Sequence, residues 1–544
     1  MTWISPVSAG NEHGADVLGG KGAGLVLLRR LGLPVPPAFV IGAGACRAFL
    51  RDGRFPDGLH EELAAALADL EAGMGRRLGG RDRPLVVSVR SGGSVSMPGM
   101  MSTVLNVGLT EATTAALAAE TGDLPFALDS RLRLLTSFGA AVFGLPPESL
   151  DAAERDAGNA ETRLAAAVRG VEAAIRQRAG EPVPDDATRQ VELAVRAVFA
   201  SWNTSRARTY RELNDISHEL GTAVTVQAMV FGNRDDRSGT GVAFSRDPNT
   251  GERVPFGEVL FGCQGEDVVS GRSTTDPLSG LAERSPAVWA GLVNALNRIE
   301  QHYRDSCYVE FTFEAGRLWL LQVRPGRFVG RAGVRVAVAL AGEGVISRDE
   351  ALLRISAQHL QYARTPRVDT ADMVDLLGRG LGACPGAAVG RVATTADRAA
   401  RMVADGPVIL VRPSTSPADM HGLAAAAGVV TARGGPASHA AVVARAMGKP
   451  AVVGVPHLTV DVAGGQVCFG ARTVAEGALV TIDGTGGEVV AGSARIAAAA
   501  TDPHLDRLIA WADEVSGAGT HGTAVDRLEA AHRVLNRGRA KRAG

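Results

Sequence analysis

The residues best suited to chemistry are Ser438 and His439, which follow two glycines at 434–435 and precede an Ala/Val-rich run at 440–445. This order predicts a helix that begins beside His439, so that the imidazole lies near free backbone N–H groups. A neutral ring nitrogen is a good nucleophile toward phosphorus, and the helix N-terminus would stabilise the phosphate that it accepts. A capping serine followed by a histidine that only packs explains these residues equally well.

A second candidate is Lys21, one of only three lysines in a chain whose other basic residues are arginines; the others are Lys449 and Lys541. It lies in a glycine-rich segment, 18–24, in front of an apolar run of helical character at 25–31. A glycine-flanked lysine before a helix can place backbone N–H groups and an ammonium against a polyphosphate. The segment does not match GxxxxGK[ST], and an ordinary glycine-rich turn explains it too.

A glycine- and hydroxyl-rich loop at 91–103 follows the strand that we expect at 85–90. The strand ends at Arg90, and the loop offers hydroxyl and N–H groups to phosphate oxygens. Its composition would also let it close over a ligand. A further segment, 226–230, is apolar and β-like, and could line an adenine slot or serve only as a core strand.

A β-hairpin is predicted from an alternating strand, a turn and a returning strand within 309–324. Side chains two residues apart face the same side of a strand, so Glu310, Gln322 and Arg324 can share one face. Such a face offers oxygen ligands for Mg²⁺ and a guanidinium for phosphate. The alternative is an ordinary solvated surface.

Composition limits the remaining possibilities. The chain has 544 residues, 46% of them hydrophobic and 21% charged, with a formal net charge of -1. This length allows three or four domains, and the charge balance indicates neither nucleic-acid nor membrane partners. The N-terminus lacks the basic and apolar regions of a signal peptide, which favours a cytoplasmic protein. Five scattered cysteines without a CxxC pair predict neither a disulfide framework nor a zinc site.

Over roughly residues 1–500 the sequence resembles the pyruvate, phosphate dikinase family, with several long motifs in family order. The segment around His439, with Gly448 and Lys449 behind it, resembles the swivelling phosphohistidine domain of that family. Similarity to the nucleotide-binding half lies in segments 19–22, 88–92, 96–101, 197–203, 224–233, 238–248 and 264–271.

The resemblance implies a multidomain fold of the α+β and α/β classes. It places an ATP-grasp domain at 1–340, in which two α+β lobes clamp ATP between sheets. A helical linker would follow at 341–379, and a β/β/α phosphohistidine domain at 380–500. The remainder, 501–544, would be a short helical tail.

The resemblance also implies a reaction. His439 would accept a phosphoryl group from ATP with the help of Lys21 and Arg90, and its domain would then swing on the linker to deliver the group elsewhere. In pyruvate, phosphate dikinase the donor step yields AMP and, with inorganic phosphate as co-substrate, pyrophosphate. Related enzymes that use water share the same histidine chemistry.

Substrate and metal positions are implied as well. Besides the two basic residues just named, Glu310, Gln322 and Arg324 match the ATP and metal positions of the family, with Mg²⁺ at Glu310 and Gln322. Gln227 and Met229 lie in the segment that would line the adenine slot.

Four positions depart from the family pattern. The acid that usually precedes the metal-site glutamate by two residues is Tyr308 here, and the closing loop has Ser94 in place of an arginine and Ser102 in place of an aspartate. These changes alter the charge near the phosphates, where phosphoryl transfer is most sensitive to it. Ala437 replaces a threonine that is often regulatory, which excludes control by phosphorylation at that position.

Two functions are therefore predicted as alternatives. In the first, a dikinase-like phosphotransferase passes the phosphoryl group from His439 to pyruvate on a separate barrel protein, or to another small acceptor. We predict a separate barrel protein because residues 508–515 resemble only the lead-in to the pyruvate-binding barrel of the family. We expect the barrel itself to be missing. In the second, the protein is a catalytically impaired, nucleotide-binding regulator. A homodimer is compatible with either.

Overall fold

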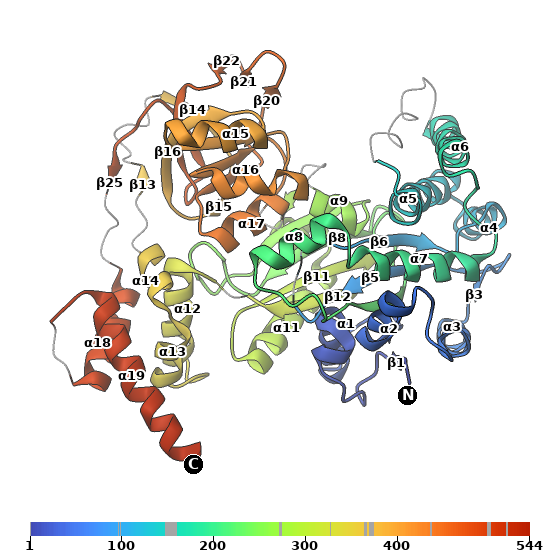
Figure 1. The fold of residues 1–544 in the computed structure, drawn as a ribbon, viewed down its shortest axis with the longest axis horizontal. Helices are drawn as coiled ribbons and strands as arrows, with labels where there is room; N and C mark the ends of the chain where they lie inside the picture. The colour runs from blue at the N-terminus through green and yellow to red at the C-terminus, as the bar shows by residue number, and fades with distance from the viewer. Residues whose placement is uncertain are drawn as a thin grey trace. The chain divides into compact units, whose positions relative to one another are not determined.

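The computed structural model describes residues 2–95, 97, 99–146, 160–270, 275–326, 328–363, 367–368, 375–435, 438–497, 502–517 and 521–543. The chain forms two compact units, which we describe separately (Figure 1). The first comprises Met1–Arg234 with Trp319–Val323, and the second comprises Asp235–Leu318 with Arg324–Gly544. The expected mixed α/β multidomain fold is confirmed. Among the described residues, no helix is both long and apolar enough to cross a membrane.

The first unit is built on an antiparallel five-stranded sheet with the order β1-β2-β7-β5-β6. Every residue of the central strand β7 is buried, because helices α1, α2 and α7 pack against the sheet. The strands of this unit are β1 (Ile4–Pro6), β2 (Ala38–Ile41), β3 (Arg77–Leu78), β4 (Pro84–Leu85), β5 (Val87–Gly92), β6 (Thr103–Val107) and β7 (Ala223–Ala228). Its helices are α1 (Ala15–Arg30), α2 (Ala43–Asp52), α3 (Leu59–Met74), α4 (Glu111–Thr121), α5 (Leu124–Val142), α6 (Ala160–Ala179), α7 (Ala187–Ser201) and α8 (Ser205–Leu213).

Helix α1 differs from the prediction of a glycine-rich turn at 18–24 followed by a helix. It begins at Ala15 and is interrupted only at Gly19, which has φ 66° and ψ 165°. A side chain at Gly19 is excluded, because its Cβ would lie 1.6 Å from the carbonyl oxygen of Gly92. Lys21 therefore lies inside α1, at the start of the segment that follows the break, and the expected turn is a single residue in a conformation that suits glycine.

The second unit contains a five-stranded sheet with the order β10-β9-β8-β11-β12. Its last two strands form the predicted hairpin, which is confirmed, although Trp319–Val323 in the middle of β12 belong to the first unit. The elements of this region are β8 (Gly239–Phe244), β9 (Phe256–Phe261), α9 (Gly265–Ser270), β10 (Asp276–Pro277), α10 (Gly280–Arg284), α11 (Pro286–Tyr303), β11 (Cys307–Glu314) and β12 (Arg317–Pro325).

One helix from the end of the expected ATP-grasp domain and four from the expected linker and tail pack around one hydrophobic core in the second unit. Leu352 from the linker and Leu508 and Trp511 from the tail are among its buried side chains. The sequence placed these two segments in separate regions and did not predict that they pack together. The helices are α12 (Gly330–Gly342), α13 (Arg348–Arg354), α14 (Ala357–Ala363), α18 (Pro503–Ser516) and α19 (Ala524–Ala543).

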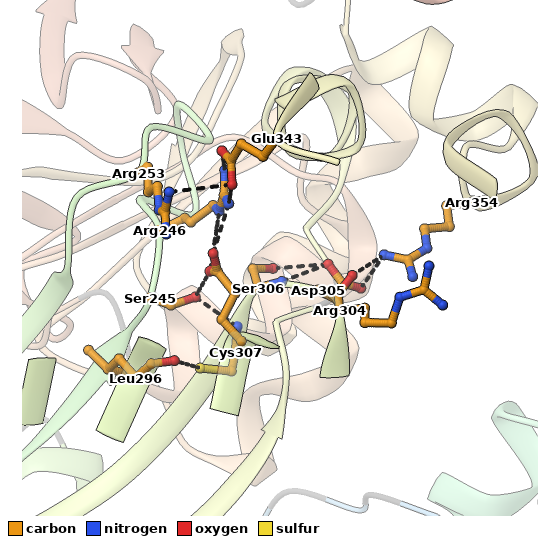
Figure 2. Close-up of polar contacts among 11 residues, drawn as sticks. Ser245, Arg246, Arg253, Leu296, Arg304, Asp305, Ser306, Cys307, Glu343 and Arg354 are labelled. Carbon is orange, nitrogen blue, oxygen red and sulfur yellow. Dashed lines mark hydrogen bonds and ion pairs between the residues drawn. The ribbon is translucent and has the colours of Figure 1, made fainter. Parts of the chain in front are cut away.

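A buried ionic network joins the end of helix α12 to the sheet that contains β8 (Figure 2). The guanidinium of Arg246 lies 2.7 Å from Glu300 of α11 and 3.0 Å from Glu343 at the end of α12. Burial opposes the charge on Arg246, but its hydrogen bonds to the two carboxylates outweigh burial and raise its pKa. Ser245 donates a hydrogen bond to Glu300 and accepts one from the backbone N–H of Cys307, so the network also fixes the start of β11.

The remaining part of the second unit is an eight-stranded sheet with the order β14-β24-β23-β16-β17-β18-β19-β15. Strands β16 to β19 are parallel neighbours, and alternate residues of β18 face two different cores. Val429 packs toward helices α15 to α17, and Val430 packs toward the side that includes a small three-stranded sheet.

The bounds of these elements are as follows. The large sheet comprises β14 (Leu376–Arg379), β15 (Leu381–Cys384), β16 (Ala387–Ala393), β17 (Val408–Arg412), β18 (Gly428–Thr431), β19 (Ala451–Val453), β23 (Leu479–Asp483) and β24 (Glu488–Ala491). The small sheet comprises β20 (Leu458–Asp461), β21 (Gln466–Phe469) and β22 (Arg472–Ala475), and β13 (Arg367–Val368) pairs with β25 (Ile496–Ala497). The helices are α15 (Ala396–Met402), α16 (Met420–Ala425) and α17 (His439–Met447), with 3₁₀ turns at Val403–Asp405 and Pro417–Asp419.

Candidate functional site

His439 is the first residue of α17, and Ser438, with extended backbone angles, is its N-cap. The predicted strand before this histidine and the predicted helix start at it are confirmed. The side chain of Ser438 makes no capping hydrogen bond to the helix. The capping alternative therefore does not explain why a serine stands there.

Three buried polar atoms near the start of α17 lack a hydrogen-bond partner among the described residues. They are Oγ1 of Thr431 at the end of β18, Oγ of Ser438 and Nε2 of His439. Buried polar atoms in folded proteins are nearly always paired, so a group of unpaired ones indicates the place of a polar ligand. Burial lowers the pKa of His439, an effect that nearby Asp419 only partly opposes, so the imidazole is neutral at physiological pH.

The other ring nitrogen of His439 has a partner that the sequence did not reveal. Oγ1 of Thr415 lies 3.1 Å from Nδ1 of His439. Thr415 follows β17, the parallel neighbour of β18, and the carboxyl ends of parallel strands meet at one edge of a sheet. The run of hydroxyl residues at 414–416 directly after a predicted strand was the signal that could have identified it.

Two polar residues that follow Thr415 in the sequence, Asp419 and His421, have different surroundings. Asp419 is buried, forms an ion pair with Arg412 at 3.3 Å and accepts hydrogen bonds from Ser416. His421 instead lies at the surface, 2.8 Å from Asp397. Asp419 thus belongs to the surroundings of His439, whereas His421 does not.

Lys449 has a structural role. Its ammonium donates hydrogen bonds to the carbonyl oxygens of Ala424 and Ala426, at the end of α16. A cation at the C-terminal end of a helix satisfies carbonyl groups that have no partner within the helix.

In the first unit, Lys21 lies against the end of the strand that contains Arg90. A Cβ at Gly92 would be 3.4 Å from Cβ of Lys21, and the N–H of Gly20 donates to the carbonyl oxygen of Gly93 at 2.9 Å. Arg90 precedes these glycines on β5. The structure therefore brings together the lysine, the end of the strand and the beginning of the loop that the sequence predicted as phosphate ligands.

Gln227 and Met229 occupy the strand that was expected to line an adenine slot. The side chain of Gln227 is buried and donates to the carbonyl oxygen of Pro36 at 3.3 Å. The backbone N–H of Met229 donates to Val86, and its side chain packs against the core of the unit. Gln227 thus has a structural hydrogen bond, and the adenine slot stays a prediction.

Tyr308 on β11 lies in an aromatic and cationic stack. Its ring is 5.0 Å from that of Phe244, and the guanidinium of Arg324 lies 4.2 Å from the ring centroid. Burial raises the pKa of Tyr308, and the charge of Glu310 adds to this effect, so its hydroxyl stays protonated. Tyr308 therefore cannot replace the carboxylate that the family has at this position.

Of the predicted metal ligands, Gln322 carries the clearest structural signal. Its Oε1 atom is buried and has no hydrogen-bond partner in the described part of the chain. Glu310 lies two residues after Tyr308 on β11, the neighbouring strand in the sheet order. Within the described residues, no group of three or more His, Cys, Asp or Glu side chains could hold a metal ion.

The two serines of the closing loop differ in exposure. Ser94 is exposed, whereas the backbone N–H of half-buried Ser102 donates to Oγ of Ser201 at 3.1 Å. Ala437 lies outside the described residues.

Comparison with known proteins agrees with this arrangement. Residues 50–291 match the model of the pyruvate phosphate dikinase AMP/ATP-binding domain, and residues 404–487 match that of the mobile domain of PEP-utilising enzymes. The chain is 41% identical over 522 residues to pyruvate, phosphate dikinase 1, chloroplastic, of Arabidopsis thaliana, covering 93% of the chain and 54% of that protein.

Two further relatives are similar to the same extent. Identity to pyruvate, phosphate dikinase of Rhizobium meliloti is 41% over 507 residues, covering 88% of the chain and 56% of the relative. Identity to pyruvate, phosphate dikinase 2 of Zea mays is 42% over 522 residues, covering 93% and 59%. The chain thus spans little more than half the length of these relatives. It belongs to the pyruvate, phosphate dikinase family.

Proposed function

We propose that this protein is an ATP-dependent phosphotransferase in which His439 carries the phosphoryl group. The observation that supports this most directly is the group of unpaired buried atoms at the start of α17, which includes Nε2 of a neutral histidine. A histidine that only packs would not leave its nitrogen and the neighbouring Ser438 hydroxyl without partners.

The contact with Thr415 determines which nitrogen reacts. When Nδ1 carries the proton, it donates to Oγ1 of Thr415, and the lone pair lies on Nε2. Nε2 then attacks phosphorus, a new N–P bond forms, and a P–O bond of ATP breaks with its electron pair leaving on the nucleotide. The hydroxyl of Ser438 and the N-terminus of the nine-residue helix α17 stabilise the negative charge of the product.

In this proposal the phosphates of ATP bind to Lys21, to Arg90 and to the loop that follows Arg90. Arg324 binds the phosphates as well. Gln227 and Met229 lie at the adenine slot. Both ammonium and guanidinium groups neutralise charge that develops on the transferred group.

The residues present also fit a Mg²⁺ ion. Glu310 and Gln322 would hold it, since Gln322 has a buried oxygen without a partner and Glu310 supplies a carboxylate. Mg²⁺ is commonly held by one or two carboxylates together with substrate phosphates and water, so a protonated Tyr308 does not prevent binding. When bound, the ion neutralises charge on the phosphates of ATP.

The acceptor belongs to the proposal too. The relatives are named for pyruvate and phosphate, so pyruvate bound to a separate barrel protein is one acceptor and another small molecule is the alternative. His439 keeps one phosphoryl group of ATP, and either inorganic phosphate or water would accept a second one. Analysis of the reaction products will show which of the two is the co-substrate. A cytoplasmic location and a homodimer complete this proposal.

The test is incubation of the purified protein with Mg²⁺ and ATP labelled at each phosphate in turn. We expect an acid-labile, base-stable label on the wild-type protein and none on His439→Ala. His421→Ala, which changes an exposed histidine in the region of the eight-stranded sheet, should be labelled like the wild type. Label that persists in His439→Ala would overturn the proposal.

A second function is favoured by Tyr308. If the loss of the acid stops phosphoryl transfer, the protein is a nucleotide-binding regulator. In the same experiment it would bind ATP, measured by calorimetry, but no variant and no wild-type sample would carry label.

A further inference from the structure

Two described positions of the loop between β5 and β6, Gly93 and Ser102, lie beside the end of α7 and the residue that follows it. At one end, the backbone N–H of Ser102 donates to Oγ of Ser201 at 3.1 Å. At the other end, a Cβ placed on Gly93 would lie 3.9 Å from Cζ3 of Trp202, so the indole edge lies beside this glycine. Gly93 also accepts the hydrogen bond from Gly20, next to Lys21.

Trp202 is in turn fixed by Arg211 of α8. The guanidinium of Arg211 lies 4.3 Å from the centroid of the indole, and one of its nitrogens donates to the carbonyl oxygen of Trp202. The two other guanidinium nitrogens lie 3.1 and 3.0 Å from Nδ1 of His218. The indole N–H closes the cycle by donating to the carbonyl oxygen of His218 at 2.8 Å. Trp202, Arg211 and His218 thus form one cluster.

The choice of residues in this cluster is not explained by packing alone. Arg211 is completely buried, and within the described residues its hydrogen bonds go to neutral acceptors; burial lowers its pKa. A buried cation without a carboxylate partner is costly, and a packed apolar side chain would stabilise the fold better if packing were its only role. Two guanidinium N–H groups can point at Nδ1 only when that nitrogen carries no proton, so His218 takes part as a neutral acceptor.

We infer that Trp202, Arg211 and His218 are positioning residues that hold the loop at 92–102 in place to bind the phosphates of ATP. They touch no substrate, and they act through Gly93 and Ser102 at the two ends of the loop. The inference rests on the proposed function, since it takes the phosphates to bind at this loop and at Lys21. A loop that is fixed before ATP arrives does not have to be ordered on binding, which strengthens the affinity for ATP.

Replacement of His218 tests the role of the cluster best, because its side chain is half-exposed and its replacement need not disturb the core. His218→Leu removes the acceptor for Arg211, whereas His218→Gln keeps an acceptor oxygen. Thr209→Ala changes an exposed side chain of α8, the helix that contains Arg211, and is the matched control. Arg211→Met removes the cation itself.

Two quantities are measured for each variant. Hydrogen exchange of the nucleotide-free protein reports on the backbone of 99–103 and on Gly20. The initial rate of His439 labelling, measured at several ATP concentrations, gives an apparent KM for ATP and a maximal labelling rate. We expect His218→Leu to speed exchange there and to raise the apparent KM about tenfold with little change in the maximal rate, whereas His218→Gln and Thr209→Ala stay near the wild type.

Unchanged exchange or unchanged KM in His218→Leu would overturn the inference, as would an equal effect of His218→Gln. If Arg211→Met does not fold, the two His218 variants decide. Failure of the proposed function looks different: the wild-type protein then carries no label, while exchange and the dissociation constant for ATP, measured by calorimetry, still report on the cluster.

Discussion

Oγ1 of Thr415 lies 3.1 Å from Nδ1 of His439, although 24 positions separate the two residues in the sequence. The contact joins the carboxyl end of β17 to the N-terminus of α17. A hydrogen bond to one imidazole nitrogen fixes the ring orientation and the tautomer, and so determines the reactivity of the other nitrogen.

The first prediction concerns this contact. Thr415→Val keeps the shape of the side chain but removes its hydroxyl, so Nδ1 loses its partner and the reactive tautomer is less populated. We expect the initial rate of His439 labelling to fall about 10- to 100-fold, the range typical of partners that orient a reactive histidine. Thr415→Ser keeps a hydroxyl and should retain most of the rate. Equal rates in the valine and serine variants would contradict this role.

The second prediction concerns pH. Protonated imidazole has no lone pair for attack, and burial holds the pKa of His439 below its ordinary value of 6.5. The labelling rate should therefore stay constant as the pH falls to 6.5 and decline only at lower pH. Asp419 opposes the effect of burial, so Asp419→Asn should shift the decline to still lower pH. A decline that begins above pH 6.5 would exclude the buried, neutral histidine as the nucleophile.

The third prediction concerns Gly19. In Gly19→Ala the new Cβ would overlap the carbonyl oxygen of Gly92, and the backbone has a positive φ as well. Gly53→Ala is the matched control, because Gly53 has a similar φ of 69° but no atom within 4 Å of the new Cβ. We expect the control to lower the free energy of unfolding by about 1 kcal/mol and Gly19→Ala by more, measured with urea. ATP affinity should fall only in Gly19→Ala.

The fourth prediction concerns Gln322. Since its buried Oε1 has no partner among the described residues, Gln322→Leu removes an unsatisfied polar atom and should stabilise the nucleotide-free protein by about 1 kcal/mol. The same variant loses an oxygen ligand, so the Mg²⁺ concentration needed for half-maximal labelling should rise. Thermal unfolding with and without Mg²⁺ and ATP separates the two effects. A variant that is less stable in both conditions would show that Gln322 has a structural role only.

Local sequence signals predicted much of the site. The alternation of side chains around Glu310 specifies the hairpin of β11 and β12, and the glycines followed by an apolar run specify the helix start at His439. Both patterns depend on neighbours within a few residues, so no knowledge of the tertiary fold is needed to read them.

Contacts between distant residues could not be read in this way. Thr415 reaches His439 only because β17 and β18 are parallel neighbours. Lys449 was a candidate on account of its rarity, yet its ammonium binds the carbonyl groups at the end of a helix remote in sequence. The glycine-rich segment around Lys21 belongs to a helix that is broken only at Gly19, and the contact that requires a glycine there is with Gly92, which is distant in the sequence.

The buried salt bridges of Arg246 limit where a moving arm could pivot. Glu343, at the end of α12, is bound to a guanidinium whose other carboxylate partner lies on α11. The end of helix α12 is therefore bound through Arg246 to α11. If His439 moves as proposed, we expect the chain to bend after residue 343, because the two carboxylates hold the residues before it.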